Sequence, residues 1–411
     1  MISTLLHAVF LPPLLYSLTI SVYLLAVTTA AHWPKRRAPK GVVLPSFGVI
    51  IPAHDEEPQI HATVAAVLDQ NYARECFDVY VLADNCSDGT ADVARKAGAV
   101  VFERSDPADR GKGQALDWCL SNHPELLRRH DAIVIIDADA TMDERFLEEM
   151  AGMLEDETVS AVQAENVVAN PEVNWRTALT YAGFALINCV RSAGRVRLGG
   201  AAGLKGNGMV LRSDLLARYG WPAHSVVEDI EFATRLLLDG HYISYCGAAR
   251  VSSDMPAGRK EAESQRNRWE AGKVSVVARH APLLLRAWLR RRQWRYLDAC
   301  LDLATPPLSM LVFGQGLLVA VSAFAAPRFF PLFTACAIAT LLHVVLGLRL
   351  VHAPRTVWLQ LLASPVFLAW KLTLYARFLI KPREKGWVRT PRESEVGKKL
   401  RKGFDRSDGS R

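Results

Sequence analysis

The stretch Ala132-Ile133-Val134-Ile135-Ile136-Asp137-Ala138-Asp139 sets an apolar, mostly β-branched run directly before two acidic residues. A run of this length and composition predicts a strand that is buried on both faces of a sheet. Two carboxylates one residue apart are oxygen ligands of the kind that a hard divalent cation prefers. We therefore predict that Asp137 and Asp139 bind Mg²⁺ or Mn²⁺ beside a diphosphate; two solvated acids in a turn are the alternative.

Upstream of this strand, short apolar runs alternate with helical patterns. Strands are predicted at residues 47–51, 77–83 and 99–102, and helices at residues 57–69, 90–97 and 113–120. This alternation indicates βαβ units, and therefore an α/β fold with a mostly parallel sheet that is covered on both faces. Ligands of such sheets bind beyond the carboxyl ends of the strands. Pro52, Asp84 and Asp137 all stand at such ends, so we expect them to converge.

Polar residues at these strand ends are candidates for binding a nucleotide. In Pro52-Ala53-His54-Asp55-Glu56 the predicted contacts are Pro52, Ala53, Asp55 and Glu56, with helix capping as the alternative for the acids. Asp84 ends the second strand and can accept hydrogen bonds from a base or ribose. Lys112, in Arg110-Gly111-Lys112-Gly113, can bring charge to a phosphate at a helix N-terminus, although the Walker A spacing is absent.

Two motifs farther along the chain supply further chemistry. Glu228-Asp229 follows the segment Gly206-Asn207-Gly208, whose glycines allow a ligand to approach the backbone closely. A carboxylate opposite a leaving group can take a proton from an attacking hydroxyl, and Asp229 is our candidate with Glu228 in support. An acidic pair at the start of a helix is also a common structural feature. Gln265-Arg266-Asn267-Arg268-Trp269 adds guanidinium groups that suit phosphate and an indole that suits the apolar face of a sugar.

Four apolar segments flank these motifs, at residues 5–31, 303–326, 329–348 and 357–380. The first three are long enough to cross a bilayer, which takes roughly 20 apolar residues, whereas Pro365, Lys371 and Arg377 interrupt the fourth. No Lys or Arg precedes the first segment, which favours a retained anchor over a cleaved signal peptide. Basic residues follow it at Lys35, Arg36, Arg37 and Lys40, so the positive-inside rule places the next domain in the cytoplasm.

The net charge of +7 is concentrated near the apolar segments. Arginines alternate with apolar residues over residues 281–300, which predicts one amphipathic helix lying on the membrane surface. The tail from Lys381 carries eleven basic and five acidic residues; in a tethered chain this favours anionic lipid over nucleic acid as its partner. The seven cysteines show no CxxC pairing, so neither a disulfide framework nor a zinc site is predicted.

The order of the motifs resembles that of the membrane-embedded family 2 glycosyltransferases, which include cellulose, chitin and hyaluronan synthases and bacterial exopolysaccharide synthases. The family's pattern is matched in turn by Asp84, by Asp137 with Asp139, by Glu228 with Asp229, and by Gln265 through Trp269. The resemblance implies a GT-A fold, an inverting reaction, a UDP-sugar donor and Mg²⁺ or Mn²⁺. It also implies that Gln265 and Arg268 face the donor diphosphate and that Trp269 contacts the acceptor, to which we also assign Gly206, Asn207 and Gly208.

A further match to these synthases lies beyond the last apolar segment. Trp387-Val388-Arg389-Thr390-Pro391-Arg392 looks like their gating loop, which implies that Trp387, Thr390 and Arg392 contact bound donor. Two positions depart from the family pattern: Asp55 stands where Asn is usual, and Val227 stands where Thr is common. Three clean spans are also few for a polymer channel, so processive synthesis would need a homo-oligomer or an export partner.

The predicted organisation is an anchor at residues 1–34, a cytoplasmic GT-A domain at 35–280, an interfacial helix at 281–300, transmembrane and interfacial helices at 301–380, and a basic tail at 381–411. The leading hypothesis is a bacterial inner-membrane enzyme that adds sugars from a UDP-sugar to a poly- or oligosaccharide through β-glycosidic bonds. Transfer of a single sugar to a lipid, as in ceramide glucosyltransferase-like enzymes, is the alternative. A catalytically inactive scaffold or nucleotide sensor is a third hypothesis, against which the full set of acidic residues argues.

Overall fold

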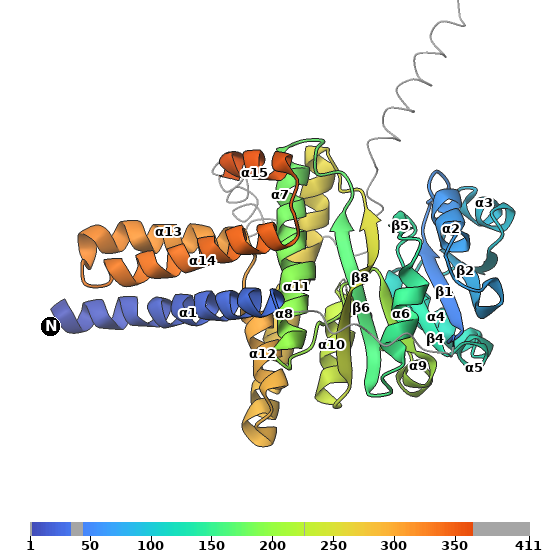
Figure 1. Ribbon diagram of the computed structural model, residues 1–411, viewed down its shortest axis with the longest axis horizontal. Helices are drawn as coiled ribbons and strands as arrows, with labels where there is room; N and C mark the ends of the chain where they lie inside the picture. The colour runs from blue at the N-terminus through green and yellow to red at the C-terminus, as the bar shows by residue number, and fades with distance from the viewer. Residues whose placement is uncertain (1, 34–43, 226, 365–411) are drawn as a thin grey trace, which may run out of the picture.

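The computed structural model describes residues 2–33, 44–225 and 227–364, and Figure 1 shows their arrangement. A sheet with its covering helices lies at one end of the molecule, and three long apolar helices project from the other end (Figure 1). Most of the basic linker, the fourth apolar segment after residue 364, and the tail with Trp387, Thr390 and Arg392 lie outside the described residues.

The sheet has eight strands in the order β3-β2-β1-β4-β7-β6-β8-β5. The strands are β1 Phe47–Ala53, β2 Phe77–Asp84, β3 Val100–Arg104, β4 Ala132–Ile135, β5 Ala140–Met142, β6 Val159–Val168, β7 Met209–Arg212 and β8 Tyr242–Ser253. The four strands from β3 to β4 are parallel, as the sequence predicts. β7 runs antiparallel to both β4 and β6, so the sheet is mixed in its second half.

Two layers of helices cover the sheet, and the alternation of side chains along β1 shows why both layers are needed. Phe47, Val49 and Ile51 pack in one apolar cluster, and Ile50 packs in the other. The first cluster is closed by α2 Ile60–Leu68, α3 Thr90–Lys96 and α6 Phe146–Leu154, and the second by α4 Lys112–Asn122, α5 Glu125–Arg129, α9 Ser213–Tyr219 and α10 Glu228–Leu238. Each fully buried side chain of this kind contributes about 1.5–3 kcal/mol.

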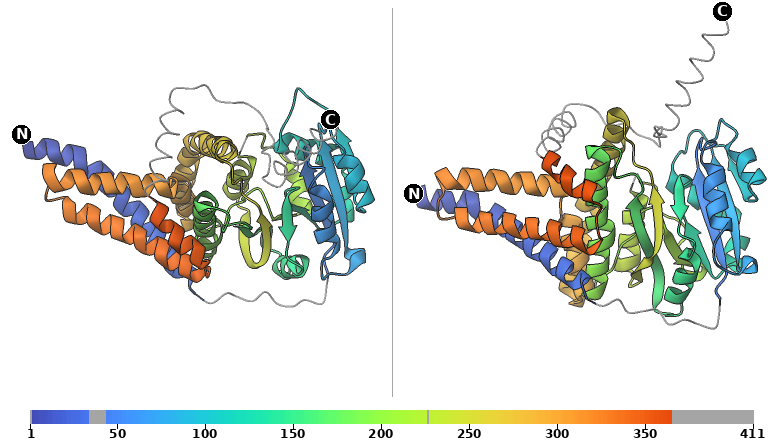
Figure 2. Two further views of the ribbon diagram at one scale, coloured as in Figure 1. Left: turned by 90° about the horizontal axis from the view of Figure 1, so that it is seen from above. Right: turned by 45° about the horizontal axis from the view of Figure 1, so that its top comes forward.

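A set of helices lies between the sheet and the projecting apolar helices. It consists of α7 Trp175–Phe184, the π-helical segment η2 Ala185–Arg191, α8 Ser192–Arg197, α11 Arg259–Arg291 and α12 Trp294–Ala304. Asn174 caps α7, because its side-chain oxygen accepts hydrogen bonds from the backbone N–H groups of Arg176 and Thr177. The views in Figures 1 and 2 show α7 and α11 running across the direction of the apolar helices. This layer therefore separates the sheet from the membrane-length segments.

The segment predicted as one amphipathic helix is divided between two. Arg292 adopts a left-handed conformation with φ 55°, and Gln293 is extended, so α11 ends at Arg291 and α12 starts at Trp294. Leu283, Leu289 and Trp294 are 40–49% exposed, as expected for an apolar side that faces lipid. The sequence prediction was wrong about a single helix because no proline or glycine marks the break.

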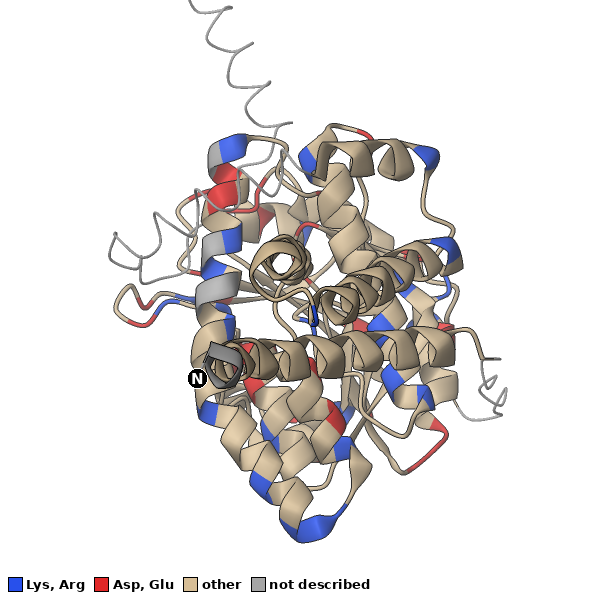
Figure 3. Ribbon diagram, turned by 90° about the vertical axis from the view of Figure 1, so that its left-hand side faces the viewer, with Lys and Arg blue, Asp and Glu red and all other residues tan. Residues whose placement is uncertain are grey.

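Three helices are long and apolar enough to cross a membrane: α1 Ile2–Ala31, α13 Leu308–Ala325 and α14 Phe330–Leu350. α13 starts five residues later than predicted, because the residues before Thr305 belong to α12 and two prolines follow. Figure 3 shows these helices nearly free of charged residues, with Lys and Arg on the helices around them. The described part of the fourth segment forms the short helices α15 Arg355–Gln360 and η3 Leu361–Ala363.

Polar side chains join the three apolar helices to one another. Ser21 on α1 accepts a hydrogen bond from Gln315 Nε2 on α13 at 2.9 Å, and Thr28 Oγ1 lies 2.5 Å from His343 Nδ1 on α14. Such groups need partners inside the protein because lipid offers none. These contacts fix the register of α1 against α13 and α14. They thereby also help to position the helices that lie between the sheet and the apolar helices.

Candidate active site

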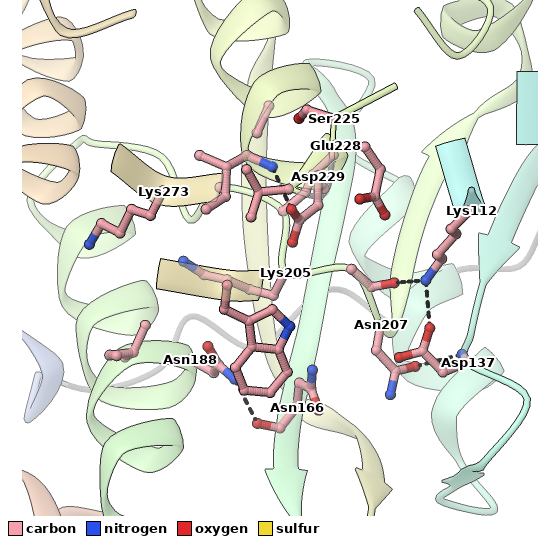
Figure 4. Close-up of a pocket in the computed structure, with 18 of the residues that line it drawn as sticks. Lys112, Asp137, Asn166, Asn188, Lys205, Asn207, Ser225, Glu228, Asp229 and Lys273 are labelled. Carbon is pink, nitrogen blue, oxygen red and sulfur yellow. Dashed lines mark hydrogen bonds and ion pairs between the residues drawn. The ribbon is translucent and has the colours of Figure 1, made fainter. Parts of the chain in front are cut away.

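The carboxyl ends of β1 and β4, the loop before β7, the start of α10 and the first half of α11 border a cavity of about 640 Å³. Figure 4 shows Lys112 and Asp137 on one side of this cavity, Asp229 and Glu228 near its middle, and Lys273 and Asn188 on the opposite side. The lining residues lie up to 251 positions apart, from Pro52 to Leu303. The sheet brings those at its strand ends together, as the strand-end argument predicts.

Most of the predicted site residues line this cavity. The lining includes Pro52, Glu56, Lys112, Asp137, Asp139, Gly206, Asn207, Glu228, Asp229, Gln265, Arg268 and Trp269. The remaining predicted residues that are described, Ala53, Asp55, Asp84 and Gly208, do not form part of its wall. Each of these four has packing or hydrogen bonds that place it beside the cavity rather than in it.

Asp84 is fully buried at the end of β2. Its Oδ1 accepts a hydrogen bond from Arg104 Nη1 at 2.8 Å, and its backbone oxygen lies 2.8 Å from Nδ1 of His54, which does line the cavity. Its Oδ2 has no hydrogen-bond partner within the described residues. A buried carboxylate oxygen without a partner costs free energy. Asp84 Oδ2 can therefore accept a further hydrogen bond, and the residue is separated from the cavity by His54.

Asp55 holds two loops together. It has φ 54°, and its Oδ1 accepts a hydrogen bond from the backbone N–H of Ser87 at 2.6 Å. Burial raises the pKa of Asp55, but this hydrogen bond lowers it, and the net result is a lowered pKa. The Asp55 carboxylate therefore ties the end of β1 to the loop after β2.

Lys112 and Asp137 form an ion pair at the end of the cavity nearest the parallel strands. Lys112 Nζ lies 2.5 Å from Asp137 Oδ1 and donates to the carbonyl oxygen of Gly206 at 2.5 Å. Although burial lowers the pKa of Lys112, the carboxylates of Asp137 and Glu228 raise it above the ordinary value, so the side chain is cationic. Asn207 Oδ1 accepts a hydrogen bond from the backbone N–H of Asp137 at 3.1 Å, which fixes the turn after β4.

The donor set at this end fits a divalent cation. Asp137 and Asp139 both line the cavity, and the Asp137 side chain is 41% exposed, so its second oxygen is open to a ligand. Hard cations prefer carboxylate oxygens together with water and phosphate oxygens. Asp137 and Asp139 could therefore hold Mg²⁺ or Mn²⁺, with Lys112 sharing the Asp137 carboxylate.

Glu228 and Asp229 stand side by side at the start of α10. Burial and the neighbouring charge of Asp229 raise the pKa of Glu228 to about 8. Burial also raises the pKa of Asp229, against the hydrogen bond that its Oδ1 accepts from the backbone N–H of Ile230 at 2.8 Å. A Cβ on Gly206 would lie 3.4 Å from Asp229 Oδ2, so only glycine leaves open space above this oxygen. Both shifts favour the protonated forms, and the larger shift is on Glu228, so Asp229 is the more acidic member of the pair.

The motif at residues 265–269 places three residues on the wall of the cavity from α11. Gln265, Arg268 and Trp269 line the cavity, and the ring of Trp269 lies 5.8 Å from the ring of Phe184 on α7. Trp269 is 37% exposed although it is a large aromatic residue. The indole and the Phe184 ring thus offer an apolar surface between the acidic pair and the layer of crossing helices.

The sequence analysis assigned no role to the cavity's other end. Asn166, Asn188, Arg191, Lys205, Lys273 and Asp302 line it, beside the apolar residues Ile187, Ala299 and Leu303. Asn188 and Arg191 lie on η2, and a π-helical turn often marks a functional site. The sequence shows Asn166, Arg191 and Lys205 as polar residues in an otherwise apolar region, but nothing in it links them to α12.

A buried network of ion pairs forms this end of the cavity. Arg191 pairs with Asp302, and Arg195 Nη1 lies 2.9 Å from Asp302 Oδ2. Arg195 Nη2 lies 2.9 Å from Asp298 Oδ2, and Asp298 also accepts a hydrogen bond from Tyr23 on α1 at 2.9 Å. Burial raises the pKa of Asp302, but the positive charges of Arg191 and Arg195 outweigh this and hold the pKa well below its usual range. The network joins η2 and α8 to α12 and to the first apolar helix.

The arrangement supports one line of chemistry along the cavity. Groups that could hold a cation and phosphates lie at Asp137, Asp139 and Lys112, and the carboxyl group of Asp229 lies in the middle. A partly apolar, basic chamber lies on the side of the crossing helices. A molecule whose phosphate leaves at the first end could react with a hydroxyl that enters from the second, with Asp229 as proton acceptor.

The chain is similar to several known proteins. The family described as "Glycosyltransferase like family 2" matches residues 45–272. Beta-monoglucosyldiacylglycerol synthase of Trichormus variabilis is 26% identical over 366 residues, covering 84% of this chain and 76% of its own length. Probable glycosyltransferase YdaM of Bacillus subtilis is 27% identical over 242 residues, 57% of this chain and 56% of its own length. A mannosyltransferase from Pyrobaculum calidifontis, solved with GDP-Man and Mn²⁺, aligns with a TM-score of 0.49 and 20% identity over 80% of this chain and 95% of its own.

Proposed function

The chain belongs to glycosyltransferase family 2, with a mixed α/β fold of the GT-A type, and from this we propose that it transfers a single sugar from a nucleoside diphosphate sugar to a hydroxyl of a membrane lipid. The observation that carries the proposal is the course of the cavity. It starts at Asp137 and Asp139, passes Asp229, and ends against η2 and α12, the helices that meet the apolar segments.

A lipid acceptor accounts for the composition of the far end of the cavity. Ile187, Ala299 and Leu303 bring apolar atoms to the wall there, and η2 and α12 contact the membrane-length helices α1 and α14. The Trichormus variabilis relative is by its name a synthase of a glucosylated diacylglycerol. Three membrane-length helices in the described residues are also enough to bring the cavity to a lipid surface.

The donor end of the cavity would hold the nucleoside diphosphate. Asp137 and Asp139 would bind Mg²⁺ or Mn²⁺, which when bound offsets charge on the departing diphosphate. Lys112, Gln265 and Arg268 add a cation, an amide and a guanidinium to the same space. Pro52 and Glu56 line the wall near the free Asp84 oxygen, and together with Asp55 and Ala53 they shape the place for the nucleoside.

Asp229 would act as the base in an inverting transfer. The acceptor oxygen forms a bond to the anomeric carbon as the bond from that carbon to the diphosphate oxygen breaks, and the acceptor proton moves to Asp229. The pKa of Glu228 is raised to about 8, and Asp229 is the more acidic of the two, so Asp229 would carry the negative charge first. Lys112 and Lys205 favour that anion from opposite sides.

A poly- or oligosaccharide acceptor, the leading prediction from the sequence, remains the second candidate. The observation that favours it is Trp269, whose partly exposed ring can pack against the apolar face of a sugar. A growing chain would need a path through the membrane that three helices of one copy do not enclose, and hence a homo-oligomer or an export partner. Either acceptor fits a catalytic domain on the cytoplasmic side of a bacterial inner membrane, as the positive-inside rule predicts.

The test is a product assay on the full-length chain in detergent with Mn²⁺ or Mg²⁺. Radiolabelled UDP-glucose, UDP-galactose, UDP-N-acetylglucosamine and GDP-mannose would be offered with a bacterial lipid extract, and products would be separated by chromatography and size. We expect one labelled lipid, which disappears in Asp229→Asn while UDP binding by calorimetry persists. A high-mass polymer instead would move the enzyme to the second candidate. Transfer that survives Asp229→Asn would show that another group is the base.

A further inference from the structure

Lys205 is a cation in the cavity without an anionic partner at hydrogen-bond distance. Its backbone N–H donates to Gln163 Oε1 at 2.8 Å, but its ammonium group makes no hydrogen bond or ion pair to any of the described residues. The side chain is half-buried and lines the cavity, and in Figure 4 it lies on the other side of Asp229 from Lys112. Burial lowers its pKa, a sign that the surroundings do not compensate the charge.

The charges around Lys205 leave it with a positive excess. Lys205 Nζ and Arg195 Nη1 each lie 4.0 Å from the place where a Cβ on Gly203 would stand, so the two cations flank one spot. Asp302 is already paired with Arg191 and with Arg195, and Asp298 is paired with Arg195. Asp229 also attracts Lys205, but without a hydrogen bond or ion pair to it. Lys273 brings a further ammonium group to this wall, where it donates to the carbonyl oxygen of Thr305 at 2.7 Å. A buried, unpaired cation is costly and is stabilised by an anionic ligand.

The position of this excess separates it from the donor site. Lys112 faces Asp137, where a donor diphosphate and its metal would bind, whereas Lys205 faces the ion-pair network that joins η2 to α12. A second, small cavity of about 20 Å³ continues from here, since it shares Ile187 and Arg191 with the first. Its other walls include Leu24, Leu186, Leu308 and Leu311 from the apolar helices and η2. The basic chamber is therefore next to an apolar gap at the membrane-length segments.

We propose that Lys205, with Lys273 and Arg191 beside it, binds a phosphate group of the acceptor, so that the acceptor is a phosphate-bearing lipid rather than a neutral one. That the bound lipid is the acceptor rests on the proposed function. That Lys205 binds a phosphate group does not depend on it. In this arrangement the phosphate lies at the membrane side of Asp229, the acyl chains lead toward the apolar gap, and a headgroup hydroxyl reaches Asp229. Charge-assisted hydrogen bonds to phosphate supply the selectivity.

Binding and transfer can be measured with one matched pair of lipids, dioleoyl phosphatidylglycerol and dioleoylglycerol. Native mass spectrometry of the full-length protein in detergent would count the copies of each lipid retained, and transfer would be followed in phosphatidylcholine vesicles that contain one or the other. We expect the wild type to prefer phosphatidylglycerol in both measurements. Lys205→Met should lower that preference about tenfold, Lys205→Arg should retain most of it, and UDP affinity should stay the same in both variants.

Arg286→Met is the matched control, because Arg286 is exposed on α11 outside the cavity and should change only general attraction to anionic lipid. Equal retention of phosphatidylglycerol by the wild type and Lys205→Met would overturn the proposal, as would loss of UDP binding in Lys205→Met, which would assign Lys205 to the donor. If millimolar inorganic phosphate competed as strongly as the lipid, the ligand of Lys205 would be free phosphate and not a lipid headgroup. Lys205-dependent lipid binding without transfer from any nucleotide sugar would leave the subsite standing and remove the proposed function.

Discussion

Lys112 Nζ lies 2.5 Å from Asp137 Oδ1, and the same ammonium group donates to the carbonyl oxygen of Gly206 at 2.5 Å. This contact joins the first turn of α4 to the end of β4 and to the loop before β7. It also places a monovalent cation on one of the two carboxylates that we assign to a divalent metal. Without nucleotide, Lys112 and a metal ion therefore compete for the Asp137 carboxylate. A bound diphosphate would contact both cations.

The first prediction follows from that competition. Without nucleotide, Lys112→Met should bind Mn²⁺ several-fold more tightly than the wild type, because the ammonium no longer competes for Asp137. With UDP the order should reverse, since the variant lacks one cation for the diphosphate. Mn²⁺ binding can be measured by electron paramagnetic resonance with and without UDP. Lys112→Arg, which keeps the charge, is the control, and equal Mn²⁺ affinity in all three proteins would refute a shared carboxylate.

The second prediction concerns Glu228 and pH. Its pKa is raised from 4.5 to about 8, so between these values the folded protein holds a proton that the unfolded chain has released. Stability should therefore fall as pH rises through this window. Glu228→Gln cannot ionise, and its advantage over the wild type should grow from near zero at pH 4.5 to on the order of 2–4 kcal/mol at pH 8.

Thermal melting in detergent from pH 4.5 to pH 8.5 would measure this difference. Glu155→Gln is the control, because Glu155 is exposed at the end of α6. A melting difference between Glu228→Gln and the wild type that does not change with pH would show that Glu228 is ionised throughout the range.

Local patterns were enough to predict the first half of the sheet. The β-branched run before Asp137 and the apolar runs that end at Pro52 and Asp84 each mark a strand and its end without reference to any other part of the chain. Parallel order follows from the helices between them. That Pro52, Lys112 and Asp137 share one wall of the cavity was predictable for the same reason, because they follow those strands or begin the helices between them.

The second half and the membrane end could not be predicted in this way. β7 inserts between β4 and β6 through pairings that span 46 to 80 residues, and its short sequence shows no preference for antiparallel neighbours. Arg191 and Asp302 meet across 111 positions, and each alone is only a charged residue near an apolar run. Asp84 stands at the end of a strand as predicted, but its burial and its pairing with Arg104 on β3 depend on the register between strands.

The third prediction tests that register contact. Arg104 is 4% exposed and its partner Asp84 is fully buried, so Arg104→Met leaves a buried carboxylate without its cation and should lower the free energy of unfolding by about 3–5 kcal/mol. Arg95→Met removes an exposed arginine that pairs with Asp92 and Glu103 on the surface, and its effect on the free energy of unfolding should be much smaller. Denaturant titration of both variants in detergent measures the contrast. Similar losses would mean that Asp84 is solvated or protonated in the folded protein.

The last prediction separates two glycines that the sequence treats alike. Gly206 and Gly208 both have positive φ, 77° and 67°, so alanine costs roughly 1–2 kcal/mol of backbone strain at either position. A Cβ on Gly208 would also stand 2.7 Å from Val251 Cγ2 and 3.0 Å from Ala164 Cβ inside the sheet. Among the described residues, a Cβ on Gly206 would meet the carboxyl group of Asp229, with Oδ2 at 3.4 Å and Cγ at 3.9 Å.

Gly208→Ala should therefore lose several kcal/mol of stability while any folded fraction keeps its specific activity. Gly206→Ala should lose little beyond the strain but should lower kcat at least tenfold, because its methyl group fills the space above Asp229 where an acceptor hydroxyl must lie. Melting curves and initial rates per folded protein, measured on the same preparations, distinguish the two. If Gly206→Ala kept full kcat, the acceptor hydroxyl would not approach Asp229 from the side of the loop before β7. An acceptor that enters past η2 and α12 would then have to react at another place in the cavity.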